Sequence, residues 1–465
     1  MVKLPEKFSE RMKEMLGDEA FGEYVASFEK PARSGVRINT LKLNVDEWEK
    51  ISPFEGKRVP WLDNAFFYGK EDNPSKHPYY YAGMYYIQEP SAMTPAALFD
   101  VKPGDKVLDL CAAPGGKSTA LAAKLKGEGL LVCNDISNSR AKALLKNIEL
   151  FGVKNALVLS ESPERLLPVF TGFFDKIIVD APCSGEGMFR KQHSIMSNWE
   201  QYGTGYYAKL QKDILALAVK MLKPGGRLLY STCTFSPEED EEQVANLIRT
   251  NEKLSIKPLV PEEKREYYES LGFTWGRSEW MKEQLAGIEN AVRLFPHLIE
   301  GEGHFMALIE KSESESFFAG NNPIKKRIKL PAELKEFLDF SGLDYDEENI
   351  VIRNERVYLY PDDLPAIDGL RVLRCGLLLG ELKKDRFEPS QALACALDAA
   401  KYPYTVSLPS DDMRVVKYLK CESIELPEAD FDGYALIAVD GYPLGFAKVK
   451  KGNFKNKYLP GWRMM

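Results

Sequence analysis

Residues 107–125 read VLDLCAAPGGKSTALAAKL. An apolar run opens the stretch, small residues follow at 111–116, and an amphipathic segment closes it over 117–126. This pattern predicts a buried strand over 106–110, then a tight turn, then a helix. A turn of this kind brings backbone N–H groups and a helix N-terminus up to a ligand. The stretch therefore predicts an α/β domain that binds a nucleoside-like molecule.

Similar units follow along the chain. Short apolar runs alternate with amphipathic stretches, and strands separated by helices indicate a parallel sheet that is covered on both faces. We expect one further strand over 303–311. The other predicted strands occupy residues 129–135, 156–160, 174–180 and 226–232.

Two phosphate-binding motifs can be tested against the turn. The segment GGKST resembles the end of a P-loop, but that motif requires glycine five residues before its Gly-Lys pair, where Cys111 stands. The dinucleotide pattern G-x-G-x-x-G is absent too. S-adenosylmethionine fits better, because it is a nucleoside with an amino-acid tail, a sulfonium methyl group and no triphosphate.

An acid follows the next predicted strand. Asp135 comes about 20 residues after the turn, where nucleotide-binding folds place a carboxylate that accepts hydrogen bonds from ribose hydroxyls. The alternative is an N-cap for the helix predicted over 137–151. Because the strand–turn–helix unit precedes Asp135, we favour the ribose role.

Two cysteines also follow predicted strands. The segment DAPCSGEG places Asp180 and Cys183 after one strand, and YSTCTFSPEEDEE places Cys233 after another. In open α/β sheets ligands bind beyond the carboxyl ends of the strands, so all three side chains are expected at one cleft. Gly185 and Gly187 are expected to let their loop approach a ligand closely. The alternative for each cysteine is a small buried core residue.

The acidic run after Cys233 has a structural explanation. Ser236 is predicted to be a helix N-cap, Pro237 the first helical residue and Glu239 the partner in a capping box. We therefore assign Glu238 to Glu242 to the start of a helix rather than to catalysis.

Two thiols beside an acid suggest covalent chemistry on an electron-poor ring. Cytosine is a poor nucleophile at carbon 5, but a thiolate that adds to carbon 6 turns carbon 5 into an enamine-like centre that accepts a methyl group. A proton donor at ring nitrogen 3 assists the addition, and a base later removes the carbon-5 proton.

Several long motifs carry a definite resemblance. DLCAAPGGKS, VDAPCSGEG and YSTCTFSPEEDE look like the signature motifs of the Nop/Sun family of RNA cytosine-C5 methyltransferases, as do RSGVRINTLKL, YYIQEPSAM and RLFPHLIEGEGHFMALIEK. The resemblance covers most of residues 30–312, and the layout resembles the branch of bacterial small-subunit ribosomal RNA methyltransferase F. It implies a Rossmann-like α/β core that uses S-adenosylmethionine, with RNA, most of all 16S ribosomal RNA, as substrate.

The resemblance also implies roles for individual residues. Cys233 matches the nucleophile, and Cys183 matches the cysteine that removes the carbon-5 proton. Asp180 matches the aspartate that supports the base and lies near the cofactor, and Lys117 closes the first motif as a further catalytic residue. The family's aspartate after the third strand is missing, and Glu161 or Ser162 stands at about its place, so that contact is left unassigned. The implied cofactor-binding residues are Cys111, Ala112, Ala113, Pro114, Gly115, Gly116, Lys117, Asp135 and Asp180.

The chain is predicted to contain three units and a linker. We expect a small N-terminal α+β unit at 1–90, the catalytic domain at 91–312, a linker at 313–322 and a C-terminal RNA-binding extension at 323–465, which is PUA-like toward 390–465. Within the first unit, Arg33, Arg37 and Asn39 are interpreted as helping to seat RNA, while Tyr85 and Tyr86 are expected to pack rather than stack.

Lysines and aromatic residues alternate in the last segment, which is read as a terminal hairpin. This combination suits phosphates and unstacked bases, so the tail is predicted to bind RNA. The alternative is a solvated strand edge. The residues concerned are Lys448, Lys450, Lys451, Lys455, Lys457, Arg463, Phe446, Phe454, Tyr458 and Trp462.

Composition limits the remaining possibilities. The net charge of −7 argues against a protein that binds polyanions over its whole surface, although one basic face suffices for RNA. Seven thinly spread cysteines without a C-x-x-C pair argue against disulfides and a zinc site, and the four histidines are scattered, so no metal is expected. Without a signal peptide or a long apolar run, a cytoplasmic protein that contacts no membrane is predicted.

Several alternatives stay open. Transfer RNA or another RNA is the alternative substrate, and a non-catalytic RNA-binding protein is a more distant one that does not need both cysteines. No DNA partner is expected. DNA enzymes of this kind use the cysteine at the place of Cys183 as nucleophile, whereas the presence of Cys233 favours the RNA arrangement. A monomer is favoured, and the sequence does not say which cytosine is methylated.

Overall fold

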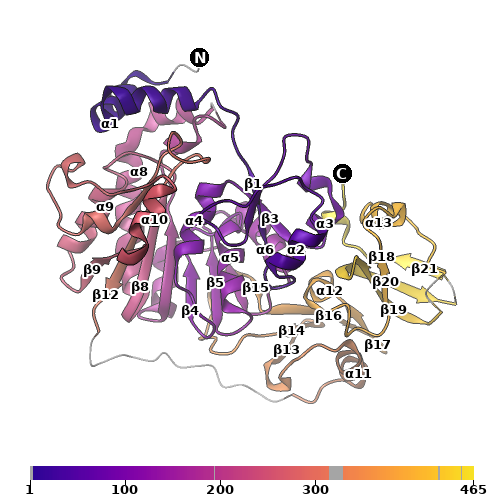
Figure 1. The fold of residues 1–465 in the computed structure, drawn as a ribbon. Helices are drawn as coiled ribbons and strands as arrows, with labels where there is room; N and C mark the ends of the chain where they lie inside the picture. The colour runs from indigo at the N-terminus through magenta and orange to yellow at the C-terminus, as the bar shows by residue number, and fades with distance from the viewer. Residues whose placement is uncertain (1–3, 193, 314–327, 428–429, 452) are drawn as a thin grey trace.

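The computed structural model describes residues 4–192, 194–313, 328–427, 430–451 and 453–465, so the linker predicted at 313–322 lies outside them except for its first residue. A ten-stranded sheet forms the centre, in the order β10-β11-β12-β8-β7-β4-β5-β6-β15, with β9 paired to β12 (Figure 1). Strands β8, β7, β4, β5 and β6 are mutually parallel, which confirms the predicted α/β class. The strands are β4 (Lys106–Asp109), β5 (Leu130–Asn134), β6 (Ala156–Leu159), β7 (Phe174–Asp180), β8 (Leu222–Thr232), β9 (Leu254–Lys257), β10 (Phe273–Trp275), β11 (Val292–Leu294), β12 (His304–Lys311) and β15 (Val372–Cys375).

Each face of this sheet has its own hydrophobic core. Successive strand residues point to opposite faces, and in β4 Val107 belongs to one core while Leu108 belongs to the other. Helices α5 and α6 pack on the first core, and α7, α8 and α9 pack on the second. Because both faces are covered, the middle of each central strand is an apolar run, as in residues 107–108 of β4 and 177–179 of β7. The helices are α5 (Gly116–Leu125), α6 (Asn138–Leu150), α7 (Pro163–Phe170), α8 (Ser194–Met221) and α9 (Glu241–Arg249).

The N-terminal segment consists of two separate parts. Helix α1 (Glu6–Ser27) lies beside α8, where Phe8 packs edge-on against Phe189 and Trp199 (Figure 1). Further along the chain, a three-stranded antiparallel sheet has the order β2-β1-β3. Its strands are β1 (Gly35–Ile38), β2 (Ala65–Phe67) and β3 (Tyr85–Gln88).

The C-terminal extension adds a strand to the central sheet, which sequence analysis did not predict. Strand β15 pairs antiparallel with β6, and the backbone of Arg371 accepts a hydrogen bond from Ser160 N–H at 3.0 Å. The four residues of β15 are too few to reveal this pairing, because the pairing of a short strand depends on its partner in the fold.

Apart from β15, the extension contains two four-stranded sheets, in the orders β13-β14-β16-β17 and β18-β19-β20-β21. The second sheet shares a hydrophobic core with the N-terminal unit, since Val406 and Leu444 belong to the same cluster as Val36 and Trp48. The antiparallel pair β20–β21 is the predicted terminal hairpin. The strands are β13 (Ile350–Arg353), β14 (Arg356–Leu359), β16 (Leu377–Lys383), β17 (Arg386–Pro389), β18 (Thr405–Leu408), β19 (Gly433–Val439), β20 (Tyr442–Lys450) and β21 (Asn453–Asn456).

Two residues interpreted as RNA contacts have structural roles instead. Arg37 is buried and donates to the carbonyl of Gly116 and the hydroxyl of Thr119, while buried Asn39 donates to the backbone of Gly83 and Phe151. Such bonds fix the N-terminal unit to the catalytic domain, so these two side chains do not face RNA. Arg33 is exposed and pairs with Glu300. Tyr85 is fully buried and packs, as predicted.

Three of the four aromatic residues of the tail are buried, unlike the prediction, and Phe454 is partly buried. Phe446, Tyr458 and Trp462 belong to hydrophobic cores, so they offer no free ring face to a base. Lysines and aromatic residues alternate in the tail because one side of the hairpin faces the core and the other faces solvent. Lys450, Lys451 and Lys455 remain exposed and are the part of the pattern available to phosphates.

Candidate active site

Two thiols meet at the carboxyl edge of the sheet. Cys183 follows β7 and Cys233 follows β8, and these strands are parallel neighbours with Asp180 opposite Ser231. The two sulfur atoms lie 3.4 Å apart, and both residues are partly exposed. This juxtaposition is the one that the sequence predicts. The hydrogen bond with the Cys233 thiol and burial together raise the pKa of Cys183 well above its ordinary value.

Asp180 lies beside the thiols within a group of polar side chains. Its carboxylate accepts a hydrogen bond from Ser231 Oγ at 2.8 Å and pairs with Lys117 Nζ at 2.7 Å. His304 Nε2 lies 3.4 Å away. Burial opposes ionisation of Asp180, but Lys117 and His304 outweigh it and hold the pKa of Asp180 well below its ordinary value. Asp180 is therefore a carboxylate at neutral pH.

In the sequence, His304 is one of four scattered histidines, and no role is predicted for it. It is the first residue of β12, which pairs antiparallel with β8, and this pairing brings it to the Asp180 cluster. Burial lowers the pKa of His304, so its imidazole is neutral at neutral pH. Only the strand order could reveal this neighbour.

The small-residue turn after β4 is held from outside by side chains. Ala112 N–H donates to the carbonyl of Asn134 at 2.8 Å, Arg140 donates to Ala113 and Asn147 donates to Pro114. Gly115 has a φ of 112°, in the left-handed region. A Cβ on the next residue, Gly116, would lie 2.8 Å from the Gln88 amide.

Asp135 stands at the end of β5, beside this turn. Its carboxylate accepts from Ala113 N–H at 3.3 Å and from Ser137 N–H at 2.9 Å. Helix α6 has Ser137 as its N-cap residue, so the N-cap alternative for Asp135 is wrong. The Asp135 carboxylate instead joins the turn to the start of the next helix.

Glu161, the unassigned acid after β6, is fully buried and bound by the C-terminal extension. It accepts from Arg371 N–H at 2.8 Å and lies 3.3 Å from the Arg371 guanidinium and 3.2 Å from that of Arg165. These contacts lower the pKa of Glu161 although burial opposes them. The extension thus reaches the carboxyl edge of the sheet.

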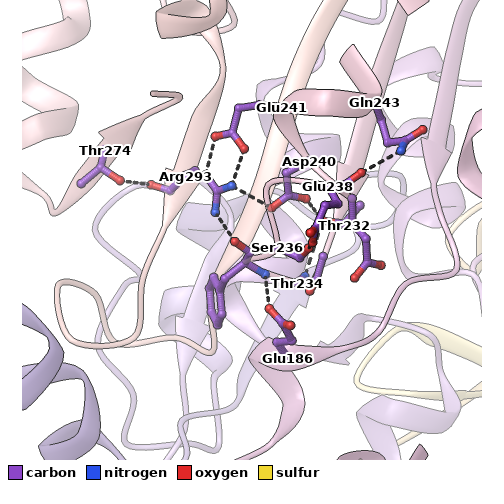
Figure 2. A network of polar contacts seen from close by, with 12 residues as sticks. Glu186, Thr232, Thr234, Ser236, Glu238, Asp240, Glu241, Gln243, Thr274 and Arg293 are labelled. Atoms are coloured by element: carbon purple, nitrogen blue, oxygen red, sulfur yellow. Dashed lines mark hydrogen bonds and ion pairs between the residues drawn. The ribbon is translucent and has the colours of Figure 1, made fainter. Parts of the chain in front are cut away.

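Contrary to the prediction, no helix begins at Ser236 in the acidic run after Cys233. Helix α9 begins only at Glu241, and Asp240, Glu241 and buried Arg293 form an ion-pair network, with Arg293 Nη2 3.1 Å from Asp240 and 2.5 Å from Glu241 (Figure 2). Thr232 Oγ1 donates to Asp240 at 2.5 Å. Residues 236–240 therefore fold inward, because a buried arginine on β11 attracts the acids.

One expectation about the cysteine loops changes as well. Gly187 was expected to approach a ligand, yet a Cβ there would lie 2.9 Å from the carbonyl of Cys233. Gly187 instead lets the two cysteine loops touch, with its N–H donating to that carbonyl at 2.9 Å.

Comparisons with known proteins decide the family. The family described as 16S rRNA methyltransferase RsmB/F matches residues 96–310, and three domains described for RsmF match residues 4–90, 334–397 and 405–464, the last being its PUA domain. Ribosomal RNA small subunit methyltransferase F of Vibrio parahaemolyticus is 33% identical over 98% of this chain and 96% of its own length. That of Erwinia tasmaniensis is 30% identical over the same shares. The chain belongs to the RsmB/F family.

Solved structures agree with this RsmB/F assignment. A methyltransferase homolog protein from Pyrococcus horikoshii is 31% identical, with a TM-score of 0.56 over 66% of this chain and 95% of that one. NSun6 from the same organism, solved with SFG, has a TM-score of 0.54 at 21% identity and shows the shared fold. The resemblance and the methyltransferase class predicted from the sequence motifs are confirmed. No helix among the described residues has the length and apolarity that crossing a membrane requires.

The residues present in this RsmB/F chain fit S-adenosylmethionine. The carboxylates of Asp135 and Asp180 lie at the same edge of the sheet as the cysteines. At the end of β4, Asp109 Oδ1 is buried and has no hydrogen-bond partner among the described residues, while Oδ2 accepts from Ser118. Hydroxyls and an ammonium group are the ligand groups that such carboxylates bind.

Asp109 leads to a pH prediction. Burial raises the pKa of Asp109 from 3.8 to about 7, with Asp180 and Asp135 contributing and Ser118 and Lys117 opposing. The folded protein therefore binds a proton that the unfolded chain releases, and this contribution to stability is lost as pH rises toward 7. The Asp109→Asn variant should not show this pH-dependent loss of stability. From pH 5 to 7, the free energy of unfolding measured in urea should fall by about 2–3 kcal/mol more in wild type than in the variant. Parallel curves of unfolding free energy against pH would contradict the assignment.

Proposed function

We propose that this enzyme methylates carbon 5 of a cytosine in 16S ribosomal RNA through a covalent bond between Cys233 and the base. The observation that carries the proposal is the pair of thiols 3.4 Å apart beside an ionised Asp180. One sulfur is needed to attack carbon 6 while a second group takes the proton from carbon 5. A protein that only bound RNA would have no use for this arrangement.

The side chains divide the reaction between them. Cys233 adds to carbon 6 as a thiolate, and S-adenosylmethionine supplies an electrophilic methyl group when bound. The pKa of Cys183 is raised, so its own thiol proton must leave before the sulfur can take the carbon-5 proton as a thiolate; the bond between Cys233 and carbon 6 then breaks, and Cys233 leaves as a thiolate. Asp180 and Lys117 act as a pair that holds the base, with the ammonium group of Lys117 as the proton donor because Asp180 is ionised.

The cofactor roles of residues 111–117, Asp135 and Asp180 belong to the same proposal. So do the domain boundaries, the cytoplasmic location and the monomeric state predicted from the sequence. The target base must leave its stack before Cys233 can reach it. The direct test is methyl transfer from labelled S-adenosylmethionine to 16S ribosomal RNA, with bisulfite mapping of the modified cytosine; transfer to a carbon or nitrogen other than cytosine carbon 5 would refute the proposal.

RNA binding by the extension cannot be tested simply by deleting the extension. Removing residues from 323 onward would also remove β15 from the central sheet and Arg371 from Glu161. Such a deletion would disturb the catalytic domain itself, so loss of binding could not be assigned to missing RNA contacts.

Exposed lysines of the terminal hairpin allow a cleaner experiment. Changing Lys450, Lys451 and Lys455 together to alanine should weaken RNA binding about tenfold and lower the slope of log affinity against log salt by about 2, because each phosphate contact releases counterions. Affinity for S-adenosylmethionine should stay within about twofold, since that site lies at the central sheet. Filter binding at several salt concentrations measures both; an unchanged salt slope would exclude this edge from the RNA interface.

A further inference from the structure

Each cysteine of the pair is followed directly by a hydroxyl residue. Ser184 follows Cys183, Thr234 follows Cys233, and their hydroxyl oxygens lie 2.8 Å apart. Ser184 Oγ also donates to Glu239 Oε1 at 2.5 Å. A serine hydroxyl has one proton, so Thr234 is the donor toward Ser184 whenever Glu239 is ionised. The two cysteine loops are thus joined by a directed chain that ends on one carboxylate.

The same carboxylate fixes the backbone on both sides of Cys183. Glu239 Oε2 accepts from Ser184 N–H at 2.9 Å and from Gln211 Nε2 at 3.0 Å. Gln211 Nε2 also donates to the carbonyl of Pro182 at 3.0 Å. Residues 182 and 184 are therefore both held, directly or through Gln211, by Glu239. The residue between them is the cysteine whose sulfur lies against Cys233.

Glu239 differs from the acids around it. Glu186 pairs with Arg11, and Asp240 and Glu241 pair with Arg293, whereas in the described part of the chain no ion pair is recorded for Glu239. It is fully buried, and burial together with the charge of Glu186 raises its pKa to about 7. A buried acid without a cation costs stability, so stabilisation alone does not explain its presence.

Two further contacts join the loops. Gly187 N–H reaches the carbonyl of Cys233 itself, and Phe235 N–H reaches Glu186 Oε2 at 3.0 Å. Each of these bonds starts from a backbone N–H that lies after Ser184 or Thr234 in the chain. The chain from Thr234 through Ser184 to Glu239 is the connection that acts on the residues directly next to the thiols.

We propose that Glu239 is a positioning residue that sets the separation of the two thiols, by joining the loops of Cys183 and Cys233 through Ser184 and Thr234. The inference rests on the proposed function, because the separation matters for a reaction that uses both sulfurs on one base. Glu239 does not touch the base; it holds the nucleophile and the proton acceptor at the distance that the ring requires.

The test compares three variants with a neighbouring control. Glu239→Ala removes the acceptor, and Glu239→Gln keeps its shape and part of its bonding. Thr234→Val keeps the shape of the threonine but cuts the bond between the loops. Glu238→Ala is the control, because Glu238 accepts from Ser236 and Thr204 and has no recorded contact with Ser184. Thermal unfolding shows which variants are folded.

The first measurement reports on the sulfur atoms without requiring catalysis. Diamide oxidises two adjacent thiols to a disulfide, taking up their two hydrogen atoms as it becomes a hydrazine. Disulfide formation depends strongly on geometry, so the rate of the Cys183–Cys233 cross-link, followed by peptide mapping, should fall about tenfold in Glu239→Ala and Thr234→Val. Glu239→Gln should lie between these variants and wild type, and the control should match wild type.

The second measurement is methyl transfer. We expect kcat to fall about 10- to 100-fold in Glu239→Ala and less in Glu239→Gln, with KM for S-adenosylmethionine within about twofold, because misplaced reacting groups slow the chemical step. Wild-type rates of cross-linking or of methyl transfer in Glu239→Ala would overturn the inference. If that variant does not fold, wild-type rates in Thr234→Val overturn it. Wild-type protein that cross-links but methylates no cytosine would instead refute the proposed function.

Discussion

Cys233→Ala should abolish methyl transfer, with a loss of at least about a thousandfold, because the substitution removes the group assigned to form the bond to carbon 6. The same variant should give no covalent complex with RNA that contains 5-fluorocytosine, which cannot lose its carbon-5 substituent as a proton. Binding of S-adenosylmethionine should be unchanged. Denaturing gels of enzyme mixed with labelled RNA measure the covalent complex directly.

Cys421→Ala provides the matched control for this experiment. Cys421 is a partly exposed thiol in the C-terminal extension, with its sulfur 3.8 Å from the carbonyl of Tyr458. The Cys421→Ala variant should methylate RNA at the wild-type rate. Methyl transfer that survives in Cys233→Ala would show that another residue is the nucleophile.

Cys183→Ala should have a different effect and trap the enzyme on its product. Addition of Cys233 and methylation can still occur, but the carbon-5 proton has no acceptor and the covalent bond to carbon 6 persists. A complex with ordinary 16S ribosomal RNA should therefore accumulate on denaturing gels, while turnover falls at least about a hundredfold.

Combining the two substitutions tests the order of events. In the double variant with both cysteines changed to alanine, the trapped complex should disappear, because trapping requires the bond that Cys233 forms. A complex that forms in Cys233→Ala but not in Cys183→Ala would reverse the two roles. The 3.4 Å separation of the sulfurs allows either to reach the ring, so this experiment decides between them.

Local pattern was enough to predict the core of the protein. The strand–turn–helix at 107–125, the cysteines after β7 and β8 and the acid after β5 all lie where the sequence placed them. These features are encoded by contiguous residues, since a buried parallel strand is an unbroken apolar run and a glycine turn has few alternatives.

Long-range contacts account for what the sequence could not show. His304 reaches Asp180 because β12 pairs with β8, and Arg371 reaches Glu161 because β15 extends the sheet. The assignment of the acids after Cys233 to a helix start failed for the same reason, since Arg293 lies more than fifty residues away in the chain. A capping box and a buried ion pair use the same residue types, and burial alone separates them.

The sequence by itself determined the α/β core, the glycine turn after β4 and the two thiols, because each depends on residues that are neighbours in the chain. Only the tertiary structure decided which charged side chains serve the site. Arg37 and Asn39 make internal hydrogen bonds, while Glu239 contacts the residue after Cys183 and His304 lies next to Asp180. The physical reason is that the environment of a polar side chain is set by strands and loops that arrive from distant parts of the chain, and its charge and role follow from that environment.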